Sequence, residues 1–474
     1  MHALSRHVAL IGFMGAGKST LGADVARRLD RPFVDLDREL EYELDAPVGE
    51  IFETRGEATF REAEEELTVE ALVDPVPGVL ALGGGALGSE RTREALRELA
   101  LAVLVEIEPD EAWRRVGGSG GRPLARDEAS FRALYEERRP LYGAAADARA
   151  RDADDVVLAA GGVHVELGAL DDLGDLVPGD GPVALVADAR VAGIHGTDAQ
   201  LALGARLAGT HELPEGEEAK TVAACERLWS ELRLGRGGTL AALGGGCTSD
   251  AAGFVAATYL RGVAWVPVPT TLVGQVDAAV GGKTALNLPA GKNLVGAFHW
   301  PARTVVDPAL LETLPERERR EGMAEVVKTG LLAGAPLWEL PEHDLVRRCA
   351  AFKTAVCLRD PLDQGPRAQL NLGHTFAHAL EAAGGYAGPT HGEAVALGLL
   401  AALRLSGNDE AARAVREVLR PQPARVDAER AWQALLRDKK GRLRLVLLPP
   451  QGGPVVEEVD EADVRRSLGE LVAG

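Results

Sequence analysis

The chain has 474 residues, of which 46% are hydrophobic and 26% charged, and this composition excludes an intrinsically disordered protein. Asp and Glu number 72 against 52 Lys and Arg, so the formal net charge is −20, which excludes general binding to nucleic acid or to anionic membranes. At about 150 residues per domain, this length predicts about three domains.

The sequence indicates a protein of the cytoplasm. No apolar run reaches the roughly 20 residues that span a bilayer. The apolar segment Val8–Met14 leads directly into a glycine-rich loop, and cleavage of a signal peptide there would destroy that loop. The four cysteines form no CxxC pair, which is typical of free thiols in a reducing compartment.

Lysine is rare, and its positions are informative. It occurs at only 8 positions, while arginine supplies the other 52 − 8 = 44 positive charges. Lysine is a compact charge on a flexible stem and arginine a planar fork, so a lysine kept in so arginine-rich a chain is a candidate site residue. The eight are Lys18, Lys220, Lys283, Lys292, Lys328, Lys353, Lys439 and Lys440.

The first predicted elements form a phosphate-binding loop. Val8–Ile11 is predicted as a buried strand, and a helix is predicted from about Ser19 to Leu29. Between them the sequence fits G-x-x-x-x-G-K-[ST], whose backbone N–H groups cradle phosphates at a helix N-terminus. Lys18 would reach the outer phosphates, and the Ser19 hydroxyl would bind Mg²⁺. The nucleotide-binding residues are then Gly12, Gly15, Gly17, Lys18, Ser19 and Thr20.

Further polar residues follow in chain order. Phe33–Asp37 is predicted as a strand with Asp35 and Asp37 on one side, although two aspartates at a strand end are often only a cap or turn. Arg61 lies in an acidic predicted helix, where a plain salt bridge is the alternative. A strand from Val79 leads into three glycines, Gly83–Gly85, and Arg122 lies in a glycine-rich segment typical of a lid. Arg138 is predicted at a helix end.

These pieces, in this order, resemble shikimate kinase across residues 5–158. The resemblance implies phosphorylation of one shikimate hydroxyl by MgATP. It implies that Asp37, Arg61 and Arg138 bind shikimate beside Gly83, Gly84 and Gly85, and that Arg122 closes over the phosphates. Ser19 and Asp35 would form the Mg²⁺ environment. Two arginines can hold a carboxylate, Asp37 can orient the attacking hydroxyl, and phosphoryl transfer needs mainly positioning and charge stabilisation.

This chain departs from the family in two places, and the departures leave an alternative open. Ala81 stands where the family often has Ser or Thr, and the last helix is reduced to Asp154–Ala160 before Gly161. The first domain could therefore be a regulatory nucleotide-binding module on a monofunctional synthase. The retained Asp37, Arg61, Arg122 and Arg138 favour an active kinase instead, because a nucleotide sensor has no need of a shikimate pocket.

The middle of the chain alternates predicted strands and helices, which favours a parallel, Rossmann-like sheet. The predicted strands are 182–188, 239–244, 264–269 and 304–307, and a helix is predicted to start near Ser249 and Asp250. The glycine triplet Gly244–Gly246 at a strand–helix junction suits a dinucleotide pyrophosphate, but it is not GxGxxG and is a weak signal alone. Beyond Pro308 the composition is typical of helices.

Histidines in the last third suggest a metal site. His374 and His378 are four residues apart and share one helical face, and His391 follows. Glu325 and Lys328 lie three apart in an apolar predicted helix. One glutamate and two histidines with an open position are a catalytic Zn²⁺ set. Scattered surface histidines and an ordinary ion pair are the alternative.

Long motifs between residues 163 and 450 resemble 3-dehydroquinate synthase. They include Gly244-Gly-Gly-Cys-Thr-Ser-Asp250, Gly281-Gly-Lys283-Thr, Gly291-Lys292-Asn293 and Asn371-Leu-Gly-His374. The resemblance implies that one site, with NAD used catalytically, converts 3-deoxy-arabino-heptulosonate 7-phosphate into 3-dehydroquinate with loss of phosphate. It also implies Zn²⁺ (or Co²⁺) on Glu325, His374 and His391, while His378 contacts the substrate phosphate.

The resemblance further implies contacts for the cofactor and the substrate. The NAD contacts are Asp188, Glu217, Lys220, Gly245, Gly246, Asp250, Thr270 and Thr271, and Lys292 is counted with the cofactor as well as with the substrate. The substrate contacts are Asp277, Lys283, Lys292, Asn293, Lys328, Lys353, Arg367, Asn371 and either Lys439 or Lys440. Among these, Asp277, Lys283, Lys328 and His378 would act in catalysis, and Arg261 would reach across a homodimer.

The fold class expected is α/β. It comprises a P-loop kinase domain (1–160), a Rossmann-like NAD-binding domain (161–308) and a mainly α-helical metal- and substrate-binding domain (309–474). Small molecules are the expected partners: ATP, shikimate and the heptulosonate phosphate. Related sugar-phosphate cyclases and metal-dependent alcohol dehydrogenases share the second scaffold, and fold does not fix chemistry. Lys353 and Arg367 favour a carboxylated substrate, since a substrate without a carboxylate would leave both cations poorly paired.

Overall fold

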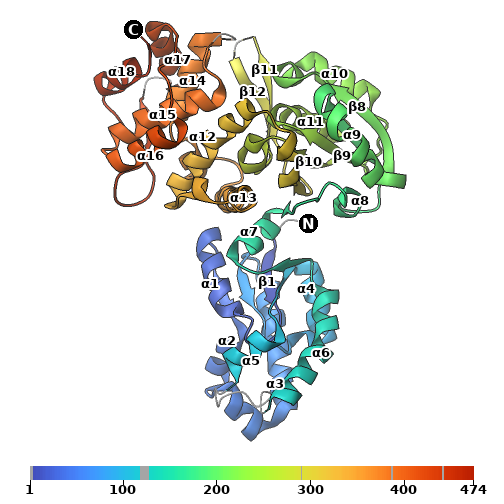
Figure 1. Ribbon diagram of the computed structural model, residues 1–474. Helices are drawn as coiled ribbons and strands as arrows, with labels where there is room; N and C mark the ends of the chain where they lie inside the picture. Colours follow the sequence, from blue (N-terminus) through green and yellow to red (C-terminus); the bar gives the residue numbers. More distant parts are fainter. Residues whose placement is uncertain (1–3, 118–126, 290, 386–387, 440–441, 474) are drawn as a thin grey trace. The chain divides into compact units, whose positions relative to one another are not determined.

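The computed structural model describes residues 4–117, 127–289, 291–385, 388–439 and 442–473 (Figure 1). The chain divides into two compact units, Met1–Gly162 and Val163–Gly474. No helix of the described residues is both long and apolar enough to cross a membrane. The predicted lid segment with Arg122 lies outside the described residues, as does Lys440.

Unit 1 is built on a five-stranded parallel sheet in the order β2-β3-β1-β4-β5. Its strands are β1 (His7–Ile11), β2 (Phe33–Asp35), β3 (Val79–Ala81), β4 (Ala100–Val105) and β5 (Ala148–Ala150). Its helices are α1 (Lys18–Leu29), α2 (Leu36–Leu44), α3 (Val48–Val73), α4 (Glu90–Leu99), α5 (Pro109–Val116), α6 (Glu128–Ala145) and α7 (Ala153–Gly161).

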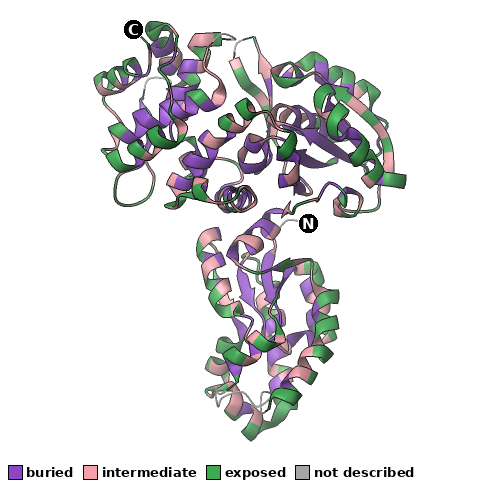
Figure 2. Cartoon of the chain, viewed as in Figure 1, coloured by how far each residue is buried: buried purple, intermediate pink, exposed green. Residues whose placement is uncertain are grey.

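The central strands of unit 1 are apolar because both faces of the sheet are covered. Every residue of β1 and β4 is buried, and Figure 2 shows the burial of the sheet against helices with exposed outer sides. Long apolar runs of this kind are what a parallel sheet between helices requires. The carboxyl ends of β1, β2 and β3 lie at one edge of the sheet, and glycine-rich segments follow β1 and β3, while α2 follows β2 directly.

Unit 2 contains a four-stranded parallel sheet in the order β10-β9-β7-β8. Its strands are β7 (Val183–Asp188), β8 (Leu207–Leu213), β9 (Thr239–Gly244) and β10 (Ala264–Pro269). Helices α8 (Leu173–Leu176), α9 (Ala189–Leu203), α10 (Val222–Glu231) and α11 (Gly246–Thr258) alternate with them. This is the expected Rossmann-like α/β arrangement, and Figure 1 shows it in green.

The remainder of unit 2 is mainly helical. Its helices are α12 (Glu316–Ala333), α13 (Glu342–Arg359), α14 (His374–Gly384), α15 (His391–Leu405), α16 (Asp409–Leu419), α17 (Ala428–Lys439) and α18 (Glu461–Gly469). Helix α15 lies in the middle of an apolar cluster to which α12, α14, α16 and α17 also contribute. Its residues from Ala394 to Leu403 are all buried, so α15 is a core helix.

The structure corrects several local predictions. Asp37 is in the first turn of α2 and not on the strand, which ends at Asp35. Arg138 lies inside α6, which continues through Pro140 to Ala145, and not at a helix end. Helix α11 begins at Gly246 rather than near Ser249, because Gly245 already occupies its N-cap.

Short strands outside the main sheets were predicted less well. The strand near Thr304 is β13 (Thr304–Val306), and it pairs with β6 (Val163–Val165) instead of joining the four-stranded sheet. The antiparallel hairpin β11 (Lys283–Leu288) and β12 (Gly291–Phe298) was not predicted, nor was the hairpin β14 (Arg444–Leu447) and β15 (Val455–Glu458). The motif glycines and lysines of the first hairpin had hidden its strand character.

Each unit has its own buried aromatic residue, which allows the units to be perturbed separately. Phe131 is fully buried between Phe13 and Trp113, at ring distances of 5.0 and 5.2 Å, and Trp265 is 1% exposed in β10. We expect Phe131→Ala and Trp265→Ala each to lower the stability of its own unit by about 3–5 kcal/mol. Scanning calorimetry should show one unfolding transition moving in each variant, and joint movement of both would contradict separate cores.

Candidate active sites

The phosphate-binding loop of unit 1 joins β1 to α1. Gly12, Gly15 and Gly17 have φ values of 140°, 83° and 88°, which side chains other than glycine rarely adopt. A Cβ at Gly12 would also lie 2.8 Å from the Val105 carbonyl oxygen. The Lys18 ammonium donates to the Gly12 and Phe13 carbonyls at 2.8 and 3.1 Å. The structure thus places the loop glycines and Lys18 together, with Ser19 and Thr20 in the first turn of α1.

The three glycines after β3 form the floor of a second polar site. A Cβ at Gly83 would collide with Glu64 and lie 2.8 Å from Asp37 Oδ1, and one at Gly85 would collide with the Arg61 guanidinium. Arg138 donates to the Gly84 carbonyl at 2.8 Å. The predicted residues Asp37, Arg61, Arg138 and Gly83–Gly85 therefore meet at one place, beside a cavity of 710 Å³ lined by Arg61, Gly84, Gly85 and Arg138.

Two residues of this site were missed by the sequence reasoning. Glu64 is 6% exposed and pairs with Arg61 at 2.5 Å. Burial raises the pKa of Glu64, and the Arg61 guanidinium opposes that rise. Tyr142 donates to the Gly84 carbonyl at 2.6 Å, and burial raises the pKa of its phenol to about 12. The spacing of Arg61 and Glu64 on one helical face was the available signal, but a run of glutamates concealed it.

Asp35 occupies the N-cap of α2, and it is buried, with 7% of its surface exposed. One of its carboxylate oxygens, Oδ2, makes no hydrogen bond, and Arg38 is 3.8 Å away from that oxygen. A buried carboxylate oxygen of this kind is suited to a cation or an ordered water. The prediction that Asp35 belongs to a Mg²⁺ environment stays a prediction.

In unit 2 the glycine triplet leads from β9 into α11, at the carboxyl edge of the parallel sheet. Gly245 is the N-cap, and a Cβ there would lie 3.0 Å from Thr271. The Thr270 N–H donates to the Gly244 carbonyl at 3.0 Å. Asp188, at the end of β7, accepts from Val191 N–H and Thr248 Oγ1 at 2.9 and 3.2 Å. A glycine turn and a carboxylate at adjacent strand ends are typical of a dinucleotide site.

A chain of ion pairs borders this glycine turn. Lys220 is 5% exposed and pairs with Asp250 at 2.6 Å, and it also donates to Asn293. Lys292 pairs with Glu217 at 2.8 Å. Five residues predicted from the resemblance therefore lie in two paired groups. Lys220 joins Asp250 and Asn293, and Lys292 joins Glu217. Asn287, which donates to Glu217 at 2.7 Å, was missed because it lies in the unpredicted strand β11.

Asp277 is the carboxylate centre of a buried group of lysines. It lies in a π-helical turn, Gly274–Ala278. Lys353 donates to its carboxylate and to its carbonyl, both at 2.7 Å, and Lys328 lies 3.9 Å away. Burial raises the pKa of Asp277, but the two ammonium groups outweigh burial and hold that pKa below its usual range. Each buried ammonium of this group thus has a carboxylate beside it, which offsets the cost of burying its charge.

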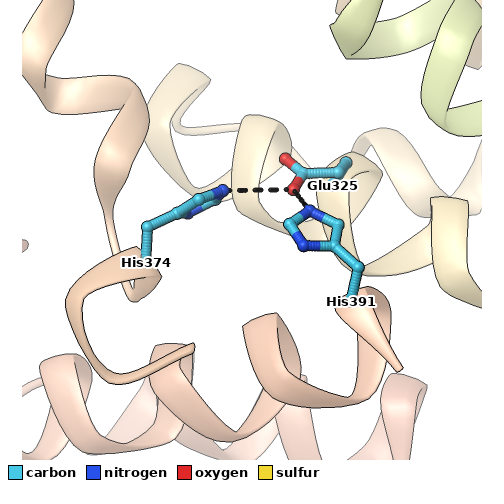
Figure 3. Close-up of side chains that lie close together, drawn as sticks. All are labelled: Glu325, His374 and His391. Atoms are coloured by element: carbon cyan, nitrogen blue, oxygen red, sulfur yellow. Dashed lines mark hydrogen bonds and ion pairs between the residues drawn. The ribbon is translucent and has the colours of Figure 1, made fainter. Parts of the chain in front are cut away.

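Glu325, His374 and His391 converge from three helices, α12, α14 and α15 (Figure 3). His391 Nε2 and His374 Nε2 lie 3.2 and 3.4 Å from the same oxygen, Glu325 Oε1. One donor atom from each residue lies within 4.8 Å of the others. Glu325 is fully buried and pairs with Lys328. Burial would raise the pKa of Glu325, yet Lys328 and the histidines lower it well below its usual value.

The two carboxylates beside His391 favour a positive charge on its ring. Burial lowers its pKa, but the Glu325 and Glu381 carboxylates on either side raise it to about 10. His378 lies outside the three-residue cluster, with its ring centroid 5.6 Å from that of His374. Spacing alone had left His378 open as a ligand, and the geometry instead groups His391 with Glu325 and His374. Glu381 was missed because a single glutamate after two histidines carries no motif of its own.

The remaining predicted residues lie in several elements of unit 2. Lys283 pairs with Asp363 at 2.6 Å, and Arg367 donates to the Gly281 carbonyl at 2.9 Å. Asn371 lies three residues before His374, the first residue of α14. Arg261 has a left-handed φ of 69°, directly after Leu260 at 52°. Lys439 ends α17.

Comparison with known proteins assigns both units. The family model "Shikimate kinase" matches residues 14–161, "3-dehydroquinate synthase N-terminal" matches 210–321, and "3-dehydroquinate synthase C-terminal" matches 322–441. The 3-dehydroquinate synthase of Bordetella pertussis is 40% identical over 340 residues, which are 65% of this chain and 95% of that protein. That of Thermosynechococcus vestitus is 40% identical over 330 residues, 62% of this chain and 89% of that protein.

A solved structure supports the same fold. Unit 2 resembles 2-deoxy-scyllo-inosose synthase complexed with carbaglucose-6-phosphate, NAD⁺ and Co²⁺, with a TM-score of 0.59 and 25% identity over 65% of this chain and 96% of that one.

A P-loop kinase domain thus precedes a Rossmann-like α/β domain and a helical domain of the kind found in 3-dehydroquinate synthase. The chain belongs to the 3-dehydroquinate synthase family, and it carries a shikimate kinase domain at its N-terminal end. It is a bifunctional shikimate-pathway enzyme with both activities, and the alternative of a purely regulatory first unit is less supported.

The buried charge group around Asp277 predicts a stability difference. In Asp277→Asn two buried ammonium groups lose their shared carboxylate, which should cost about 3–5 kcal/mol. The matched variant Asp363→Asn breaks the more exposed pair with Lys283, whose side chain is 47% exposed, and should cost about 1 kcal/mol or less. Chemical denaturation monitored for unit 2 would measure both values.

The pH dependence has a defined sign. Because the pKa of Asp277 is lowered in the folded state, its contribution is present above the unfolded pKa of about 4 and is lost as pH falls through the folded value. The gap in stability between the wild type and Asp277→Asn should therefore narrow below about pH 4. A gap that stays constant or widens there would contradict the assigned charge state.

Proposed function

We propose that unit 1 transfers the γ-phosphoryl group of MgATP to a hydroxyl of shikimate, forming shikimate 3-phosphate. We also propose that unit 2 converts 3-deoxy-arabino-heptulosonate 7-phosphate into 3-dehydroquinate and phosphate, using NAD and a divalent metal. The observation that carries the proposal for unit 2 is the convergence of Glu325, His374 and His391 beside the lysines around Asp277. For unit 1 it is the phosphate-binding loop and the arginines on Gly83–Gly85.

In unit 1 the chain's own residues would position two anions. The loop amides and Lys18 would cradle the phosphates, and Ser19 and Asp35 would hold Mg²⁺. Arg61 and Arg138 would bind the shikimate carboxylate over Gly83–Gly85, since guanidinium groups pair with carboxylates in a planar geometry. Asp37 would orient the attacking hydroxyl or accept its proton. We assign Arg122 to closure over the phosphates on the resemblance alone.

In unit 2 the donor set fits a divalent metal. One carboxylate and two imidazoles from three different helices form a three-ligand set of the kind that leaves a further position for substrate. Histidine and carboxylate suit Zn²⁺ and Co²⁺ alike, so both stay candidates. The glycine turn, Asp188 and the pairs Lys220–Asp250 and Lys292–Glu217 fit NAD. When bound, NAD accepts and returns a hydride, and the metal polarises the substrate oxygens.

The protein's part in the synthase reaction is to hold a substrate with both a carboxylate and a phosphate. Lys353 and Arg367, which are 8% and 2% exposed, would pair with the carboxylate. The phosphate side and the sugar hydroxyls of the substrate would be surrounded by polar side chains, namely Lys283, Lys292, Asn293, Asn371 and His378. Asp277 would hold Lys328 and Lys353 in place, while Lys328 would bind a substrate oxygen. Of the last pair of lysines we place Lys439 at the substrate.

The assembly is proposed as a cytoplasmic homodimer. The free cysteines, Cys225, Cys247, Cys349 and Cys357, agree with a reducing compartment. Arg261 would complete the partner's site, and its left-handed backbone, with that of Leu260, is the kind of strain found at functional positions. The net charge of −20 opposes binding of nucleic acid or an anionic membrane.

The kinase proposal is tested by removing the phosphate-binding cation. Lys18→Ala should reduce shikimate-dependent ADP formation by on the order of 10² to 10³-fold, because a charge aimed at the transferred group is lost. It should leave dehydroquinate formation unchanged. Arg27→Ala is the control, since it removes a cation from the same helix whose side chain is 80% exposed. ADP formation at the wild-type rate in Lys18→Ala would overturn the proposal for unit 1.

The synthase proposal is tested at the metal cluster. Glu325→Ala should lose bound metal and lower phosphate release by more than about 100-fold. Removing a metal ligand has a larger effect on the site than removing a residue that only orients a ligand. Kinase activity should persist. Glu316→Gln, on the same helix but with a side chain 66% exposed, is the control. Full metal content by elemental analysis, together with unchanged phosphate release, would refute the ligand assignment.

A further inference from the structure

His391 lies between two carboxylates, one on each ring nitrogen. Its Nε2 is 3.2 Å from Glu325 Oε1, and its Nδ1 is 3.6 Å from Glu381 Oε1. Glu381 comes from α14, the helix that also carries His374, while His391 begins α15. The two carboxylates therefore approach the ring from opposite edges and from different helices.

The second proposed histidine ligand is oriented in another way. His374 Nδ1 lies 3.3 Å from the backbone carbonyl of Leu372, two residues earlier in the chain. A backbone carbonyl that close in sequence holds its position without help from a side chain. His391 depends instead on a side chain, and Glu381 is the only described carboxylate that the structure pairs with its Nδ1. This asymmetry makes the role of Glu381 separable by mutation.

Glu381 itself is well placed. It lies seven residues after His374, two helical turns along the same face of α14. Its side chain is 14% exposed, and the oxygen that faces His391 is also 3.7 Å from the Lys292 ammonium, which in turn pairs with Glu217.

We propose that Glu381 is a positioning residue that holds His391 by its Nδ1 edge, so that Nε2 is directed at the metal beside Glu325. The inference rests on the metal centre proposed above. A carboxylate at Nδ1 keeps the proton on that nitrogen, leaves Nε2 free as a ligand, and increases the basicity of the ring. Lys292 holds the same carboxylate in place from the β11–β12 hairpin.

The test is the metal affinity of the full chain carrying Glu381→Gln. We expect the dissociation constants for Zn²⁺ and for Co²⁺, measured by competition with a chelator, to rise about 10- to 100-fold, the usual effect of losing such a partner. The visible absorption of the Co²⁺-loaded protein should also change, because one imidazole is less firmly oriented. Kinase activity should be unchanged and reports that unit 1 is intact, and the unfolding transition of unit 2 reports that the synthase unit is folded.

Glu393→Gln is the matched control. It removes the same charge two residues from His391, and glutamine is accepted at this position of a capping box, which here joins Glu393 to Thr390. We expect its metal affinity and its Co²⁺ spectrum to be those of the wild type. A loss of affinity equal in both variants would overturn the inference, because it would reflect general charge near the site and not contact with the ring.

The remaining outcomes are also decisive. If Glu381→Gln binds both metals within twofold of the wild type and with an unchanged spectrum, the positioning role is wrong while the metal centre stands. If the wild type itself binds no metal, the metal centre fails and the inference with it. Should Glu381→Gln not fold, Glu381→Asp serves as the second variant. Its carboxylate is one methylene shorter, and the expected weakening lies between the wild type and the glutamine variant.

Discussion

The burial of Glu325 is the constraint on which the synthase unit depends. A carboxylate with no exposed surface is tolerated only where opposite charges and hydrogen-bond donors surround it. Here Lys328 stands one turn away on the same helix, and two imidazoles reach the other side from α14 and α15. Four groups from three helices are thereby held together, and the core around α15 fixes those helices relative to one another.

The same constraint extends outward through Asp277 and the lysines. Lys328 faces both Glu325 and Asp277, and Asp277 faces Lys353, so each buried charge is balanced by the next. Acidic and basic side chains therefore alternate along this group. The substrate proposed for unit 2 carries two anionic groups, and it would exchange pairs with these side chains instead of entering a field of unpaired cations. This is how a chain of net charge −20 can handle anionic substrates.

Both units use the end of a parallel strand followed by glycine to present backbone N–H groups. In unit 1, Gly12–Gly17 follows β1 and Gly83–Gly85 follows β3, and in unit 2 Gly244–Gly246 follows β9. Close approach explains the residue type in each case. Added Cβ atoms would collide with Arg61 at Gly85 and with Thr248 at Gly244. Glycine is thus needed for the positive φ values of the loop after β1, and for the side chains packed closely over Gly85 and Gly244.

The sequence alone determined the two families, the α/β fold class, the central strands and the residues of the motifs. These are local properties, since apolar runs, glycine turns and a lysine at a set spacing act within a few residues of one another. Only the tertiary structure brought in Glu381, Asp363 and Asn287, because each joins its site through a partner on another element. Glu64 pairs with Arg61 only three residues away, and the run of glutamates around it concealed that local signal. The structure also places Asp37 in a helix and pairs β13 with β6. Burial and strand pairing depend on contacts between distant segments, which a local sequence pattern does not contain.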